Sequence, residues 1–85
     1  MSKSIELEDG DRCLLGSYQV GGAERVLFGE QINGRFCIYD QRGDQRGAKF
    51  LVEEGITEKS ELAVFLADYK QTAARLGRCP MEPDG

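Results

Sequence analysis

Three cysteines and the absence of histidine limit the chemistry available to this 85-residue chain. Histidine is the commonest general base and metal ligand near neutral pH, so Ser–His, Cys–His and mixed Cys/His zinc sites are excluded. Cys13, Cys37 and Cys79 form no CxxC pair, which leaves neither a zinc-ribbon nor a thioredoxin-type spacing. We expect small buried thiols in a reducing compartment, with Cys37 kept as a candidate reactive thiol.

The loop from Asp40 to Lys49 gathers cationic side chains that could bind an anion. Arg42 and Arg46 lie in it beside two acids, and a planar guanidinium binds oxyanions with two parallel hydrogen bonds. The loop is therefore a candidate contact for phosphate or for an acidic partner, and a solvated loop with self-neutralising charges is the simpler alternative. The spacing of Asp40, Arg42 and Asp44 resembles a calcium loop, but arginine at the middle position and the missing terminal glutamate exclude it.

The bulk composition excludes further classes of function. A net charge of −4 argues against general nucleic-acid binding, which depends on excess Lys and Arg. No apolar stretch approaches the roughly 20 residues of a membrane span, and Met1 to Gly10 lacks the apolar core of a signal peptide. We therefore expect one cytoplasmic domain with no membrane contact.

Turn signals predict the strands that must position these residues. Gly21-Gly22 and Asn33-Gly34 each separate segments rich in Val, Ile, Leu, Phe and Tyr. Asn and Gly accept the positive φ of a type I′ turn, so Asn33-Gly34 is the stronger hairpin signal. The expected strands are residues 12–20, 24–32, 35–41 and 48–53.

From Thr57 the apolar period becomes helical. Thr57 is the expected N-cap, Glu58 and Glu61 lie in the first turn, and Gly77 suits a left-handed residue after the last turn. The apolar positions of one helical face are Leu62, Phe65, Leu66, Tyr69, Ala73 and Leu76. The predicted fold is α+β, a four-stranded antiparallel β-meander with one C-terminal amphipathic α-helix packed across one face. The predicted divisions are a flexible acidic N-terminus at 1–10, a single domain at 11–77 and a flexible tail at 78–85.

Two-residue turns also predict which side chains share a face of the sheet, because directly paired residues point the same way. One face is expected to carry Cys13, Leu15, Val26, Phe28, Cys37 and Tyr39. The other is expected to carry Leu14, Tyr18, Leu27, Phe36 and Ile38 with Gly16 and Gly29. Glycine in a strand often marks close approach of another backbone, so we place the helix on the second face and expect the first to be left with little cover.

The missing catalytic motifs and the two-sided apolar sheet favour a small non-enzymatic protein-interaction or regulatory module without a cofactor or metal. The expected partner is another protein or a second copy of the chain. The candidate partner-binding residues are Phe28, Tyr39 and Val26 on the uncovered face and Arg42, Arg46 and Lys49 in the loop. Two alternatives stay open: a small-ligand binder or minimal enzyme with its site at a dimer interface, and a nucleic-acid-binding module that uses the basic loop at 42–49.

Overall fold

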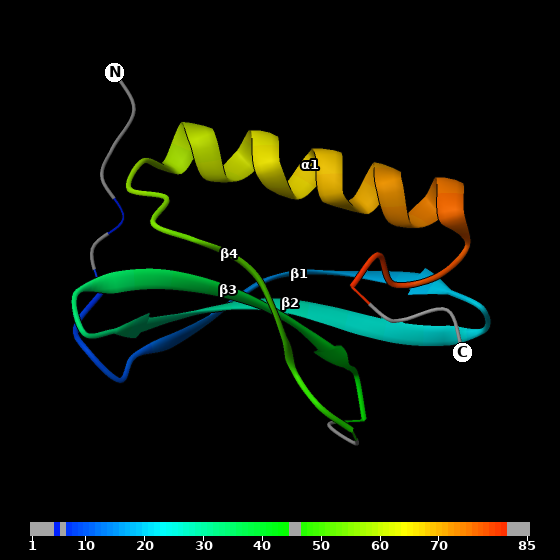
Figure 1. Cartoon of the computed structure of the whole chain (residues 1–85), viewed down its shortest axis with the longest axis horizontal. Coiled ribbons are helices and arrows are strands. Elements are labelled where there is room, and N and C mark those ends of the chain that lie inside the picture. The colour runs from blue at the N-terminus through cyan, green and yellow to red at the C-terminus, as the bar shows by residue number, and fades with distance from the viewer. Residues whose placement is uncertain (1–4, 6, 45–46, 82–85) are drawn as a thin grey trace.

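The computed structural model describes residues 5, 7–44 and 47–81. Four antiparallel strands form one open sheet in the order β1-β2-β3-β4, and a single helix, α1, lies across one face (Figure 1). The elements are β1 (Arg12–Val20), β2 (Ala23–Ile32), β3 (Arg35–Arg42), β4 (Phe50–Glu54) and α1 (Lys59–Leu76). The predicted α+β meander with one C-terminal helix is confirmed.

Both predicted hairpin turns are present with the expected backbone. Gly21 and Gly22 have φ of 57° and 79°, and Asn33 and Gly34 have φ of 52° and 79°. Two successive positive φ angles are those of a type I′ turn, whose twist matches that of the strands it joins. The second turn sets the β2–β3 register as predicted, with Phe28 opposite Tyr39.

The predicted register of β1 is wrong over its first half. A two-residue turn at Gly21-Gly22 predicts Leu15 opposite Phe28 and Cys13 opposite Glu30, whereas Leu14 and Arg12 occupy these positions. The pairing shifts between Leu14 and Gly16, so one extra residue is inserted in β1. A one-residue shift turns every following side chain to the opposite face. Cys13 and Leu15 therefore pack against the core under the helix, and Leu14 is left 73% exposed.

The N-cap of helix α1 lies one residue later than the predicted Thr57. Glu58 occupies the N-cap position with an extended backbone and no side-chain cap. The Thr57 carbonyl instead accepts a hydrogen bond from the Ile5 amide at 3.0 Å, so this residue holds the N-terminal segment. The predicted end is confirmed, because Gly77 is left-handed and its N–H binds the Ala73 carbonyl. Among the described residues, no helix combines the length and apolar character needed to cross a membrane.

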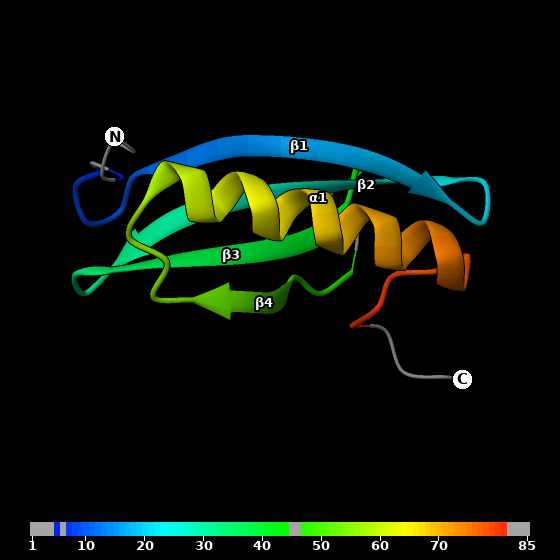
Figure 2. The same ribbon diagram turned by 90° about the horizontal axis from the view of Figure 1, so that it is seen from above.

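The core lies between the sheet and the first half of α1, which runs obliquely over the strands (Figure 2). It is centred on Phe36, Ile38 and Ile56. Partly buried apolar side chains pack around this centre: Ile5, Leu7, Cys13, Leu15, Val52, Leu62 and Phe65. The described part of the N-terminal segment, expected to be flexible, thus contributes to the core. In the segment expected to be a flexible tail, Cys79 is fully buried.

Gly16 and Gly29 lie on the helix-facing side, but side chains rather than the helix backbone fill the space above them. A Cβ at Gly29 would lie 2.3 Å from Cζ of Phe36, and one at Gly16 would lie 2.7 Å from Nζ of Lys70. The Phe36 ring therefore covers the bare backbone at Gly29. This glycine is a packing requirement of the core.

We predict that Gly29→Ala destabilises the fold by about 1–3 kcal/mol, because the methyl group displaces the Phe36 ring. Urea unfolding followed by circular dichroism measures this loss. Ser17→Ala, an exposed change in β1, is the control. In a Phe36→Leu background the cost of Gly29→Ala should fall, and an undiminished cost would contradict the packing explanation.

Candidate functional site

The predicted partner-binding aromatics lie on the sheet face away from α1, under a layer of charged side chains. Phe28 and Tyr39 stack with their ring centroids 5.5 Å apart. The Arg12 guanidinium lies 4.4 Å from the Phe28 centroid, and Nζ of Lys49 lies 4.4 Å from the Tyr39 centroid. Such cation–π contacts hold long cationic side chains flat over the rings.

Glu30 joins the two cations of this layer. Its Oε1 accepts hydrogen bonds from Arg12 at 2.9 Å and from Lys49 at 3.2 Å. Burial acts to raise the pKa of Glu30, but the hydrogen bonds from Lys49 and Arg12 outweigh burial and lower the pKa below its usual range. Phe28 is only 4% exposed beneath this layer. The face lacks a helix among the described residues, as predicted, but the Phe28 ring itself offers almost no free surface.

The structure does not bring the cations of the basic loop together. Lys49 covers Tyr39 on the face away from α1. Arg42 lies on the helix-facing side, where its backbone is opposite that of Arg25 in the β2–β3 register. Nη2 of Arg42 also forms an ion pair with Asp44 at 3.1 Å. Arg46 lies outside the described residues. The remaining predicted residue, Val26, is half-buried beside Phe28 on the face away from α1.

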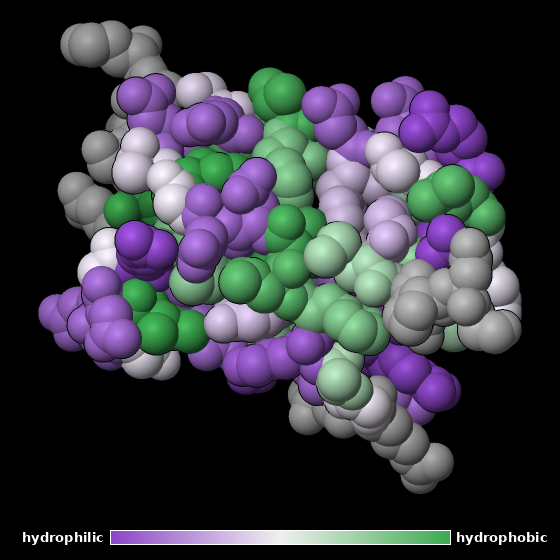
Figure 3. Space-filling model, viewed as in Figure 1, coloured by the Kyte–Doolittle hydropathy of each residue, from purple (hydrophilic) through white to green (hydrophobic). Residues whose placement is uncertain are grey.

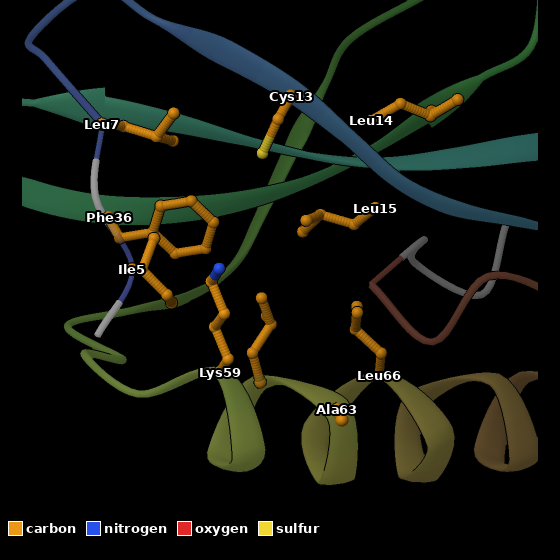
Figure 4. A pocket seen from close by; sticks show the side chains of 10 residues that line it. Ile5, Leu7, Cys13, Leu14, Leu15, Phe36, Lys59, Ala63 and Leu66 are labelled. Atoms are coloured by element: carbon orange, nitrogen blue, oxygen red, sulfur yellow. The ribbon is translucent and has the colours of Figure 1, made fainter. Parts of the chain in front are cut away.

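A groove opens between β1 and the first half of α1, with a volume of about 950 Å³. Ten residues line it: Ile5, Leu7, Cys13, Leu14, Leu15, Phe36, Lys59, Leu62, Ala63 and Leu66. The α1 residues Lys59, Leu62, Ala63 and Leu66 recur at intervals of three, one and three, which is one flank of a helix. Figure 4 shows Nζ of Lys59 directed from the first turn of α1 toward the Phe36 ring. Lys59 forms no ion pair with any residue in the described ranges.

The other flank of α1, toward β4, has the opposite charge. Apolar side chains gather near the middle of the face drawn in Figure 3. On the β4 flank, Ile56, Val64 and Phe65 line a shallower hollow. Glutamates at positions 53, 58 and 61 surround this hollow. The two flanks are therefore apolar surfaces that differ in the sign of the nearby charge.

A polar cluster lies at the opposite end of α1 from Lys59 and is centred on Asp40, which is fully buried in β3. Oδ1 of Asp40 accepts a hydrogen bond from Nε of Arg25 at 2.7 Å. Oδ2 accepts three: from the Tyr69 hydroxyl at 2.6 Å, from the Cys79 thiol at 3.1 Å and from the Tyr18 hydroxyl. One carboxylate thus links β1, β2, β3, α1 and the segment that follows α1.

The pKa values of Tyr18, Tyr69 and Arg25 are all raised in this cluster, so these three donors are held in their protonated forms. Burial is the largest cause of the raised pKa of Tyr18 and of Tyr69, followed by their hydrogen bonds to Asp40. Burial acts to lower the pKa of Arg25, but its hydrogen bond and charge interaction with Asp40 raise the pKa above the usual value. Because four donors converge on this one carboxylate, the cluster is suited to structural stabilisation and not to proton transfer.

Sequence reasoning missed this cluster, since its five residues are spread from position 18 to position 79 and form no local motif. The one available signal was the alternation of β2 and β3, which places Arg25 and Asp40 on the helix-facing side at the predicted register. Comparisons of the chain with protein-family models, curated proteins and solved structures give no match.

We predict that Asp40→Asn destabilises the fold by about 3–5 kcal/mol, because it leaves the Arg25 guanidinium buried without a counter-charge. A chain of this length has a total stability of the order of 4–13 kcal/mol, so the variant should be largely unfolded or melt at a much lower temperature. Differential scanning calorimetry measures the change. Asp44→Asn, which removes an exposed ion pair, should cost under about 1 kcal/mol, and equal losses in the two variants would contradict the role given to Asp40.

We also predict that Tyr18 and Tyr69 resist ionisation in the folded protein. Unfolded tyrosine ionises near pH 10, and the raised folded-state pKa values mean that the folded chain retains more protons above that pH. The contribution of these two residues to the free energy of unfolding is therefore fully present below about pH 10 and is lost as the pH rises further. Tyrosinate absorbance should rise for these two residues together with alkaline unfolding seen by circular dichroism. Ionisation of all three tyrosines near pH 10 in a still-folded chain would contradict this.

Proposed function

We propose that this chain is a non-enzymatic protein-interaction module whose groove between β1 and α1 binds an apolar segment of a partner protein that carries an acidic residue. The observation that carries the proposal is the groove itself, which combines apolar walls with the unpaired ammonium of Lys59 (Figure 4). The cytoplasmic location is part of the same proposal and is supported by three unpaired thiols.

The exposed apolar surface favours this groove over the face that carries Phe28. Leu14 is 73% exposed at one wall, and Leu62 and Leu66 are only half-buried at the other. Burial of such side chains on binding contributes about 25 cal/mol for each Å² removed from water. The covered ring of Phe28 has little left to contribute, since its own chain already removes it from water.

The charge in the groove favours an acidic partner segment. Among the described residues that line the groove, Lys59 is the one titratable cation and none is a carboxylate. A partner carboxylate beside its ammonium would form an ion pair that the free protein lacks, and such pairs contribute to specificity and association rate. The glutamates near the other flank of α1 would repel the same segment.

The groove also lacks the groups that catalysis requires. The polar side chains among its described lining residues are one thiol and one amine, whereas nucleophilic catalysis needs a neighbouring general base to activate the nucleophile. Binding is the function that this set of side chains supports.

Peptide display against the immobilised full-length chain tests the proposal. We expect enriched peptides to combine two or more large apolar residues with a nearby Asp or Glu. Leu66→Lys should weaken the selected peptides by about tenfold or more, because Leu66 lines the groove without belonging to the core cluster. Lys59→Glu should remove the preference for peptides with acidic residues, whereas peptides with large apolar residues should still be enriched.

Matched controls on α1 are Val64→Lys and Arg75→Glu, which change exposed positions outside the groove. Peptide binding should be unchanged in both. Selected peptides that bind the Leu66 variant as tightly as the original chain would overturn the site. Preferential binding of a fatty acid such as dodecanoate, with no peptide enriched, would replace the protein partner with a small apolar acid.

A further inference from the structure

A second hollow, distinct from the groove, lies where the β1–β2 turn meets the end of α1. Its volume is about 280 Å³, and its lining includes Gly21, Gly77, Arg25, Arg42, Arg78 and Cys79. Gly21 and Gly77 approach each other there, since a Cβ on Gly21 would lie 3.9 Å from the Gly77 carbonyl oxygen. Three guanidinium groups around one small hollow are unusual in a chain of net charge −4.

Arg25 carries a donor group that the described residues leave without a partner. The residue is 3% exposed, and its Nε is bound to Asp40, yet its Nη2 is buried and makes no hydrogen bond. Arginine remains charged under all ordinary conditions, and most buried polar groups in folded proteins are hydrogen-bonded. Because Arg25 also lines the hollow, its unsatisfied donor indicates an acceptor that the described residues do not supply.

The neighbouring arginines point to an anion as that acceptor. Arg42 lies directly opposite Arg25 on β3, and like charges in this cross-strand position repel each other. Two of the described acids near them are already engaged: Asp40 with its four donors, and Asp44 with Arg42. An oxyanion between Arg25 and Arg42 would satisfy the free donor and remove the repulsion together.

We propose that this hollow is an oxyanion site that binds a single phosphoryl group, either as free phosphate or as a phosphate monoester of a small molecule. A volume of about 280 Å³ falls just below the usual range of small-molecule pockets, so any organic part of the ligand extends outside. The paired arginines favour a tetrahedral dianion, because each planar guanidinium can direct two donors at it. The site binds without transfer, because the Cys79 thiol donates to Asp40 and the described lining residues offer no other nucleophile.

Thermal unfolding of the full chain with inorganic phosphate tests this site, with sodium chloride of equal ionic strength as the reference. At a phosphate concentration about five times Kd, a ligand that binds only the folded state should raise Tm by about 4–8 °C. Phosphoserine as a second probe distinguishes the two possible ligands. Tighter binding than inorganic phosphate indicates that the ligand is a phosphate monoester, and weaker binding indicates that it is free phosphate.

Arg42→Gln and Arg78→Gln should fold normally, since both residues are less buried than Arg25, and should reduce the phosphate-dependent rise in Tm by at least half. Arg35→Gln, an exposed change on β3, should leave the rise unchanged. Amide NMR shifts on titration should map to Gly21, Arg25 and Gly77. No phosphate-dependent rise, an equal rise in all three variants, or shifts confined to Arg12 and Lys49 would overturn the site.

Discussion

The buried ion pair between Arg25 and Asp40 is the interaction on which the rest of this fold depends. With Nε of Arg25 2.7 Å from Oδ1 of Asp40 and three further donors on Oδ2, the charged groups are matched almost completely inside the protein. A half-satisfied network of this kind would destabilise the chain more than an apolar core. The pair can be buried only because Tyr18, Tyr69 and Cys79 reach the same carboxylate from three other segments.

This cluster also explains how α1 is held. Tyr69 and Ala73 are the buried residues of the helix, and both belong to its second half, where Tyr69 binds Asp40. The first half is held by apolar contacts of Leu62 and Phe65 with the core around Phe36. Specific polar contacts therefore fix the helix at one end, and less specific apolar packing supports it at the other, where the groove opens.

The strands, the Asn33-Gly34 turn and the end of α1 could be predicted from the sequence because each depends on local chemistry: alternation, positive φ and a left-handed glycine. The β1 register could not, since the inserted residue at Leu15 has no local signature and depends on the packing of Cys13 and Leu15 under the helix. The Asp40 cluster depends on five residues that meet only in the folded chain. The groove was missed for the same reason, because it is bounded by β1, α1 and Ile5, and none of them alone indicates an opening.

The groove follows from the dimensions of the fold itself. Four strands spaced about 4.8 Å apart make a sheet wider than one helix of about 10 Å diameter, so a helix near the centre leaves apolar surface along both flanks. On the β4 side, glutamates lie around this surface. On the β1 side, the register shift turns Cys13 and Leu15 toward the helix, and the described residues that line the groove include a single cation, Lys59. Exposed apolar patches often mark interaction sites. The difference in charge is the reason why the binding site proposed for an acidic segment lies on the β1 flank.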